Sequence, residues 1–213
     1  MESIKINEIF YSLQGESSLV GLPTAFIRLT GCPMRCNYCD TAYAFNEGKN
    51  LRIIDILKEI NNFKTKYVTV TGGEPLAQKL CFDLLSKLCD KGYFVSLETG
   101  GAVSIAKVDP RVKIILDIKT PYSGESENNK WNNLSLIKTD DEIKFVIANS
   151  EDYEWAKKLI DKENIYSKAQ IIFSPVYNKL STKKLSNWIL RDHLPVRMQV
   201  QLHKFIWGDI PGV

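Results

Sequence analysis

Short apolar runs, many of them rich in Ile and Val, alternate along the chain with longer segments whose apolar residues recur every three or four positions. The first pattern predicts buried β-strands, and the second predicts amphipathic helices. The predicted strands are residues 3–11, 24–29, 67–70, 93–97, 113–118, 142–147, 170–173 and 198–202, and the predicted helices are residues 51–63, 76–88, 152–162 and 181–193. A polar stretch at residues 121–135 predicts a loop.

This order of elements predicts the fold class α/β with a largely parallel sheet, because alternating strands and helices form βα units. About six such units follow an N-terminal β-hairpin, which is fewer than the eight of a closed barrel. We therefore expect a partial, open (β/α)6-type barrel. The chain has 213 residues, of which 44% are hydrophobic, and it shows neither a linker nor an internal repeat, so a single domain over residues 1–213 is expected.

The composition is that of an ordinary globular protein. The formal net charge is +3, which is too small to indicate nucleic-acid or membrane binding. No run reaches the roughly 18 apolar residues of a membrane span, and residues 1–5 lack the apolar segment of a signal peptide. The five cysteines are an odd number and fit reduced thiols, so we expect a cytoplasmic protein.

Three cysteines lie close together directly after a predicted strand. Cys32, Cys36 and Cys39 have the spacing C-x3-C-x2-C, whereas Cys81 and Cys89 lie in or beside a predicted helix. A structural zinc site uses four protein ligands, and an iron–sulfur cube usually takes four thiolates. Three cysteines would leave one iron of a cube open to a small molecule. A zinc loop completed by a distant ligand, or thiols without a metal, are the alternatives at this point.

Polar or glycine-containing motifs follow several other predicted strands. They are Gly72-Gly73-Glu74, Glu98-Thr99-Gly100, Asp117-Ile118-Lys119 and Ser174-Pro175. The carboxyl ends of parallel strands meet at one edge of a sheet, where ligands bind in barrels and doubly wound folds. The Gly-Gly pair would let the backbone approach a ligand closely, although a tight strand-to-helix turn alone would also explain it.

Together, the cysteine loop and Gly72-Gly73-Glu74-Pro75 resemble the radical S-adenosylmethionine superfamily. The resemblance implies that the three cysteines hold a [4Fe–4S] cluster whose open iron binds S-adenosylmethionine, and that reductive cleavage of this cofactor yields a 5′-deoxyadenosyl radical. The implied cluster ligands are Cys32, Cys36 and Cys39, and the implied cofactor contacts are Tyr38, Cys39, Gly72, Gly73, Glu74, Thr99, Asp117, Lys119 and Ser174.

Residues 10–17, 21–29 and 39–41, with Glu98-Thr99-Gly100-Gly101 and Gln201-Leu202-His203-Lys204, are similar to the 7-carboxy-7-deazaguanine synthase family. The resemblance implies ring contraction of 6-carboxy-5,6,7,8-tetrahydropterin to 7-carboxy-7-deazaguanine with loss of ammonia, in the biosynthesis of queuosine or related deazapurines. Radicals of the cofactor and substrate would carry this chemistry, so no side chain is assigned a catalytic role. The resemblance also implies Mg²⁺, a flavodoxin- or ferredoxin-type reductant and a homodimer.

The implied substrate contacts are Leu13, Gln14, Gly15, Glu16, Arg28, Gly73, Glu98 and His203, and the implied Mg²⁺ ligand is Thr41. Glu98 suits the donor edge of a pterin, because a carboxylate accepts two hydrogen bonds side by side. Arg28 offers a planar fork to the substrate carboxylate, and His203, on the last predicted strand, is able to exchange a proton. The alternative for Arg28 is a structural ion pair with Glu16 or Asp40.

Two other functions stay open at this point. An activase for a glycyl-radical enzyme shares the cysteine spacing but acts on a protein, and Gln14-Gly15-Glu16, Asp40-Thr41 and Glu98 do not favour it. A non-enzymatic zinc or electron-transfer module would need only the cysteine loop. Nine residues follow Lys204, and they are expected either to fold back as a lid or to reach the pocket through their backbone.

Overall fold

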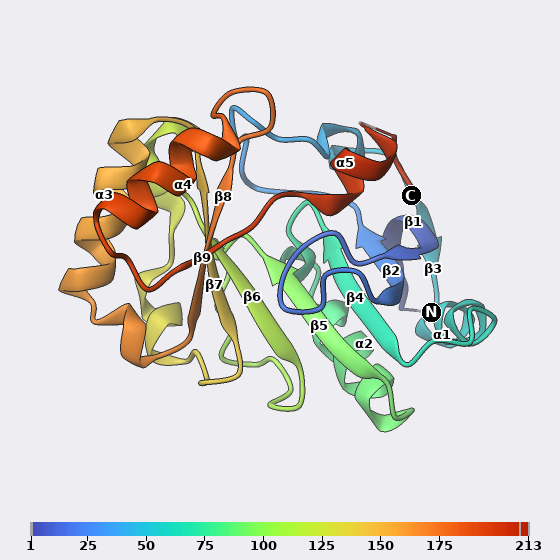
Figure 1. Ribbon diagram of the computed structural model, residues 1–213. Coiled ribbons are helices and arrows are strands. Elements are labelled where there is room, and N and C mark those ends of the chain that lie inside the picture. The colour runs from blue at the N-terminus through green and yellow to red at the C-terminus, as the bar shows by residue number, and fades with distance from the viewer. Residues whose placement is uncertain (1, 209, 213) are drawn as a thin grey trace.

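The computed structural model describes residues 2–208 and 210–212, and its strands form one mixed sheet (Figure 1). The sheet order is β3-β1-β2-β4-β5-β6-β7-β8-β9. The strands are β1 (Ile4–Leu13), β2 (Pro23–Leu29), β3 (Lys49–Leu51), β4 (Tyr67–Gly72), β5 (Phe94–Thr99), β6 (Lys113–Ile118), β7 (Glu142–Ile147), β8 (Gln170–Pro175) and β9 (Arg197–Met198). β1 pairs antiparallel with β2 and β3, and every pairing from β2 to β9 is parallel.

The helices cover one face of the sheet, and the last one lies above its upper edge in Figure 1. The α-helices are α1 (Ile53–Asn61), α2 (Leu80–Asp90), α3 (Ser150–Lys162), α4 (Thr182–Arg191) and α5 (Leu202–Trp207). The 3-10 helices are η1 (Ala42–Phe45), η2 (Pro75–Ala77), η3 (Pro121–Ser123), η4 (Ser126–Asn128), η5 (Trp131–Ser135) and η6 (Ile165–Ser167). Side-chain caps begin two of the α-helices, since Asn149 accepts from the amide of Asp152 and Ser181 accepts from that of Lys184.

The predicted fold class is confirmed, because the parallel strands form an open sheet that begins with an antiparallel hairpin. The connections are less regular than expected. α-Helices lie between β3 and β4, β4 and β5, β7 and β8, and β8 and β9, whereas the β6–β7 connection holds three 3-10 helices in the stretch predicted as a loop. Within the described chain, residues 100–112 between β5 and β6 hold no helix.

The predicted helix over residues 76–88 is interrupted by Gln78, whose backbone is extended. The Gln78 amide exchanges two hydrogen bonds of 2.8 Å with the backbone of Lys5, and it donates to the carbonyl of Thr30 at 2.9 Å. These bonds join the start of β1 to the end of β2. A tertiary contact therefore outweighs the local helical pattern, and α2 begins only at Leu80.

The prediction of a strand over residues 198–202 is wrong. β9 ends at Met198, and Leu202 starts α5, so His203 lies on a helix rather than on a strand. The Gln199 side chain causes the change of direction: it accepts from the amide of Ser17 at 2.6 Å and donates to the Ser17 carbonyl at 2.8 Å. The chain thereby leaves the sheet edge and crosses to the β1–β2 loop.

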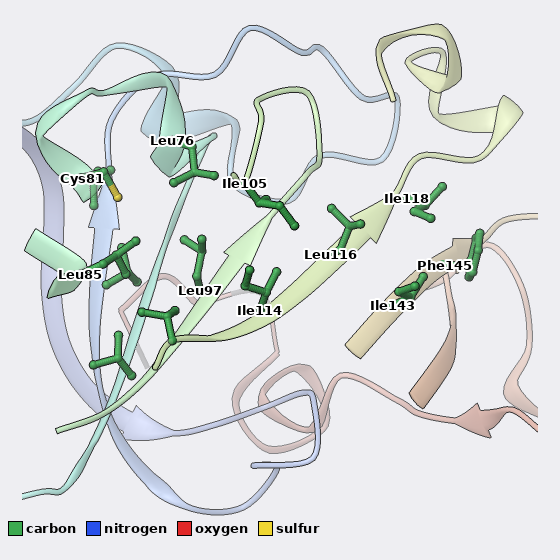
Figure 2. Packing of buried hydrophobic residues seen from close by; sticks show 14 of the residues in the cluster. Leu76, Cys81, Leu85, Leu97, Ile105, Ile114, Leu116, Ile118, Ile143 and Phe145 are labelled. Carbon is green, nitrogen blue, oxygen red and sulfur yellow. The ribbon is translucent and has the colours of Figure 1, made fainter. Parts of the chain in front are cut away.

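Alternation along the strands separates the core from the functional face. Successive side chains of a strand point to opposite faces, and Leu97, Leu116 and Phe145 belong to the apolar cluster that includes residues of α2 (Figure 2). Their neighbours Glu98, Asp117 and Lys144 line the cavity described below. In the parallel register, Asp117 lies opposite Lys144. The pleat of the sheet therefore sends charged residues of adjacent strands to one side.

The helix-free connection between β5 and β6 depends on one buried side chain. Asn133 is 1% exposed and accepts from the amide of Ile105 at 3.2 Å. It also donates to the carbonyls of Gly101, at 3.2 Å, and Val103, at 2.9 Å. One amide thus pairs three backbone groups that no helix satisfies.

We predict that Asn133→Ala lowers the free energy of unfolding by about 3 kcal/mol, because it leaves buried backbone groups without partners. Urea denaturation measures this change. The matched control is Asn132→Ala, at an exposed position next to it, which should stay within about 0.5 kcal/mol of the unchanged protein. Equal losses in the two variants would contradict the anchoring role of Asn133.

Candidate active site

A cavity of about 670 Å³ opens at the carboxyl ends of the parallel strands. Its walls come from the β1–β2 loop, the cysteine loop, the ends of β4 to β7, the β8–α4 loop and α5. The predicted site residues that line it are Leu13, Gln14, Gly15, Glu16, Arg28, Cys32, Cys36, Tyr38, Cys39, Thr41, Gly72, Gly73, Glu98, Thr99, Asp117, Lys119 and His203. Glu74 and Ser174 are buried and do not line it.

The cysteine loop and the glycine motif are held against each other by strand pairing. β2 and β4 are parallel with Leu29 opposite Gly72, and beyond the strands the amide of Glu74 donates to the carbonyl of Gly31 at 2.8 Å. A Cβ added at Gly73 would lie 2.3 Å from the Gly31 oxygen and 2.7 Å from the Cβ of Cys32. Only glycine permits so close an approach.

Cys32, Cys36 and Cys39 are free thiols on the cavity wall, each partly exposed. Burial raises the pKa of Cys36 to about 11 and also raises the pKa of Cys32, although the nearby Lys119 ammonium acts in the opposite direction. The Cys32 and Cys36 thiols are therefore protonated near neutral pH until a metal displaces their protons.

The cysteine geometry bears on the kind of metal centre. Among the residues that the structure describes, no three His, Cys, Asp or Glu side chains are grouped to hold a single metal ion. In an iron–sulfur cube, each of the three thiolates would bind its own iron.

Several buried polar atoms in this region have no hydrogen-bond partner within the described residues. They include Glu16 Oε1, Tyr38 Oη, Asp117 Oδ1 and Ser174 Oγ. The other oxygen of Asp117 accepts from Lys119 Nζ at 2.9 Å. Buried polar groups in proteins are normally paired. Because three of these residues line the cavity, their unpaired atoms indicate a polar ligand there.

A buried network of hydrogen bonds forms the floor of the cavity. Gln14 Nε2 donates to Thr69 Oγ1 at 3.0 Å and to Glu98 Oε1 at 3.3 Å, and Thr71 Oγ1 donates to Glu98 Oε2 at 3.0 Å. Burial, and then the charge of Glu16, raise the pKa of Glu98. The ionisation of this carboxylate at the cavity floor therefore depends on its burial and on the charge of Glu16.

Lys144 is a cavity residue that the sequence analysis missed. Its Nζ forms a buried ion pair with Glu16 Oε2. Burial alone would raise the pKa of Glu16, but the Lys144 ammonium outweighs burial and lowers it; the pKa of Lys144 is raised in return. In the sequence, a lysine within the apolar strand predicted over residues 142–147 was the feature that could have identified this residue.

Arg28 has a partner that differs from both expected alternatives. Its Nε forms an ion pair of 2.6 Å with Oε1 of Glu8, which lies opposite it in the β1–β2 hairpin, so the ion pair that was considered as the alternative role forms with Glu8 and not with Glu16 or Asp40. Tyr43 Oη also donates to this Glu8 oxygen at 2.8 Å. Arg28 still lines the cavity.

Glu74 joins two strand ends rather than facing the cavity. Its carboxylate accepts from the amide of Leu76 at 3.1 Å, from Thr99 Oγ1 at 2.9 Å and from the amide of Gly100 at 2.9 Å. Burial raises the pKa of Glu74 despite these donors. The side chain thus fixes the glycine turn after β4 to the end of β5. Ser174, on β8, lies opposite Val146.

Helix α5 covers part of the cavity and contacts two loops. The amide of Leu202 donates to the carbonyl of Gly15 at 3.0 Å, and a Cβ added at Gly15 would lie 2.0 Å from His203 Nδ1. Burial lowers the pKa of His203. Lys204 Nζ pairs with Asp40 Oδ2 at 3.1 Å. The helix is therefore tied to the cysteine loop, and Lys204 is a further cavity residue that was not predicted.

Asp40 and Thr41 form the junction between the cysteine loop and α5. Burial would raise the pKa of Asp40, but the Lys204 ammonium lowers it to about 2. Thr41 Oγ1 donates to Asp40 Oδ1 at 3.0 Å. The tail after α5 returns toward β1, since a Cβ added at Gly212 would lie 3.2 Å from Glu8 Oε2; Asp209 and Val213 lie outside the described residues.

No described helix is both long enough and apolar enough to cross a membrane.

The chain is similar to known enzymes over nearly its whole length. It is 50% identical over 214 residues to a 7-carboxy-7-deazaguanine synthase from Chlorobaculum tepidum, a match that covers 99% of this chain and 97% of the relative. A second such synthase, from Koribacter versatilis, is 38% identical over 219 residues, a match that covers 96% of this chain and 97% of that relative.

Solved structures agree on the fold. The crystal structure of QueE from Escherichia coli has a TM-score of 0.72 at 23% identity, with coverage of 94% of this chain and 95% of that chain. At this identity the likeness shows the fold alone. A family model for the Radical SAM superfamily matches residues 26–183. The chain therefore belongs to the 7-carboxy-7-deazaguanine synthase family within the radical SAM superfamily.

Proposed function

We propose that this enzyme converts 6-carboxy-5,6,7,8-tetrahydropterin to 7-carboxy-7-deazaguanine with loss of ammonia, in the biosynthesis of queuosine or related deazapurines. The proposal rests on the relatives' names and on one observation, which is that a single cavity joins the three-cysteine loop to a buried amide–carboxylate floor. An activase for a glycyl-radical enzyme or a non-enzymatic metal module would have no use for that floor.

The residues present fit a [4Fe–4S] cluster and S-adenosylmethionine, the cofactors that radical SAM family membership implies. Cys32, Cys36 and Cys39 would hold the cluster on the cavity wall. Gly72, Gly73 and Thr99, with Tyr38, Asp117 and Lys119, surround the adjoining space and would bind S-adenosylmethionine, for which the unpaired atoms of Tyr38 and Asp117 provide polar partners. When bound, this group supplies the radical that abstracts hydrogen from the substrate. Glu74 and Ser174, which are buried behind the cavity wall, would support this cofactor site without lining it.

The cavity floor has the groups that a carboxylated pterin needs. Glu98 and Glu16 would accept from its donor edge, and the Gln14 amide would pair beside them. Arg28 would attract the substrate carboxylate, with its orientation set by Glu8. Leu13, Gly15 and Gly73 contribute backbone and apolar walls. His203 on α5 would exclude water from the opposite side and hold or release a proton, since its lowered pKa favours the neutral imidazole.

The enzyme would also use a metal ion, an electron donor and a second subunit. Thr41 would bind Mg²⁺ beside the substrate carboxylate, with Asp40 nearby. A flavodoxin- or ferredoxin-type protein would deliver electrons, and the free thiols suit the reducing cytoplasm. A homodimer is supported by the exposed apolar side chains of Phe205 and Ile206 on α5. One sheet that contains all the described strands supports a single domain.

The direct test is anaerobic turnover of carboxytetrahydropterin with S-adenosylmethionine and a reductant, with the product followed by mass spectrometry. We expect 7-carboxy-7-deazaguanine to form. If protein with an intact cluster cleaves S-adenosylmethionine but leaves this pterin unchanged, the proposed substrate is wrong.

We predict that Cys36→Ala loses bound iron, the broad brown absorption of the reconstituted protein and all turnover, because a cube with one thiolate fewer is unstable. Cys89→Ala is the matched control, as it removes a partly buried thiol that does not line the cavity. Iron and sulfide analysis after anaerobic reconstitution distinguishes them. A Cys36→Ala protein that retains a full cluster would show that this cysteine is not a ligand.

We predict that Glu98→Gln keeps the cluster and S-adenosylmethionine binding but raises KM for the pterin about tenfold or more, through loss of a charge-assisted hydrogen bond. Because the pKa of Glu98 is raised, its charge is present above that pKa, and kcat/KM should fall as pH decreases through it. This fall is the acidic limb of the pH profile, and the Glu98→Gln variant should lose it.

The matched control for Glu98 is Asp141→Asn, at a buried carboxylate that pairs with Lys138 and lies outside the cavity. This change should leave KM and the acidic limb in place. A normal KM in Glu98→Gln would refute the assignment of Glu98 to the pterin edge.

We predict that Thr41→Ala abolishes the stimulation of turnover by Mg²⁺, whereas Thr41→Ser retains it, because the hydroxyl oxygen is the proposed ligand. Initial rates measured across a Mg²⁺ titration test this. Unchanged stimulation in Thr41→Ala would remove the residue from the proposed metal site.

A further inference from the structure

Lys144 is placed where a charge is costly unless it has a defined partner. It lies in the middle of β7, on the side of the sheet that faces the cavity, and its side chain is 10% exposed. Burial of an ammonium group costs several kcal/mol unless an opposite charge compensates it. The compensating group is Glu16, which comes from the β1–β2 loop and not from a neighbouring strand.

The ion pair leaves one oxygen of Glu16 available. Lys144 Nζ contacts Oε2, whereas Oε1 is buried and has no partner among the described residues. An ionised carboxylate only accepts hydrogen bonds, so the second oxygen needs a donor. Because Glu16 lines the cavity, a ligand bound there can supply this donor.

The backbone around Glu16 is fixed by other groups. The Glu16 amide donates to Gln14 Oε1 at 3.1 Å, and both backbone groups of Ser17 pair with the Gln199 side chain. The amide of Ser18 donates to Glu142 at 3.0 Å. Lys144 is therefore not needed to hold the loop backbone, and its direct contact is with the Glu16 carboxylate.

The charges that face Glu16 explain why this contact matters. They are Lys144 on β7, His203 on α5, Asp40 on the cysteine loop and Glu98 on β5. Two of these neighbours are carboxylates, and burial also opposes ionisation of Glu16. Lys144 is the ammonium group directly paired with Glu16.

We propose that Lys144 is a positioning residue for substrate binding: by pairing with Oε2 of Glu16, it keeps the carboxylate ionised and directs Oε1 at an N–H donor of the pterin. This inference rests on the proposed function. It adds the residue that orients Glu16, one of the groups that would accept hydrogen bonds from the substrate. Lys144 itself is not a catalytic residue.

The test compares Lys144→Met and Lys144→Arg with Lys113→Met. Lys113 pairs at 3.2 Å with the buried Glu142 on the same strand as Lys144, and it does not line the cavity. Both methionine variants leave a buried carboxylate without its ammonium partner, so both are expected to lose thermal stability. Lys144→Gln is the second neutral variant if Lys144→Met does not fold.

We expect Lys144→Met to raise both KM and the Kd from anaerobic calorimetric titration with the pterin about tenfold or more, with cluster content and S-adenosylmethionine affinity unchanged. The fall of kcat/KM at acidic pH should move to higher pH, because loss of the Lys144 ammonium raises the pKa of Glu98 as well as that of Glu16. Lys144→Arg should restore most of the affinity, and Lys113→Met should leave KM, Kd and the pH profile unchanged.

Combination with Glu16→Gln separates positioning from direct contact. If Lys144 acts through Glu16, Lys144→Met adds little to the loss already caused by Glu16→Gln. Additive losses, an unmoved acidic limb, or equal behaviour of the Lys144→Met and Lys113→Met variants would each overturn the inference. Failure of the unchanged enzyme to bind or convert the pterin would instead refute the proposed function.

Discussion

The parallel pairing of β2 with β4 is the constraint on which the active site depends. It places Leu29 opposite Gly72, and the chain continues past both strands with the Glu74 amide bonded to the Gly31 carbonyl. The cysteine loop and the glycine motif are forty residues apart in sequence, yet this register joins them with no room for a side chain at Gly73. The remaining parallel strands extend the same edge and bring the acidic motifs to it.

Several charged side chains are buried on the functional face of the sheet. Glu16, Glu98, Lys119 and Lys144 all lie at the cavity in positions where burial opposes their charged forms. Paired charges such as Lys144–Glu16 and Lys119–Asp117 make this arrangement tolerable. Such a site is organised before the ligand arrives, so binding needs little reordering of the protein groups.

The sequence predicted the open α/β fold and most of the cavity wall, because both depend on local patterns. A motif that directly follows a parallel strand must lie at the carboxyl edge, whatever the rest of the fold does. The partners across the cavity were not predictable in this way. Lys144 was visible as a charge in an apolar strand, but its pairing with Glu16 depends on where the β1–β2 loop lies. The Arg28–Glu8 pair likewise depends on the register of the hairpin.

The mistaken strand at the C-terminal end has a tertiary cause. An apolar alternation over residues 198–202 fits a strand, but Gln199 bonds to Ser17 and turns the chain into α5. Similarly, Gln78 divides a segment with helical spacing because its amide pairs with β1. In both cases a side-chain amide that satisfies a distant backbone outweighs the local pattern.

We infer that the cysteine loop and the Gln14–Glu98 floor serve one chamber. An anaerobic crystal structure of the reconstituted enzyme with S-adenosylmethionine and carboxytetrahydropterin tests it most directly. We predict a cluster on Cys32, Cys36 and Cys39, with the pterin's donor edge on Glu98 and Glu16 and its carboxylate toward Arg28. A pterin bound elsewhere, with Glu98 still paired only to Gln14 and Thr71, would contradict the account.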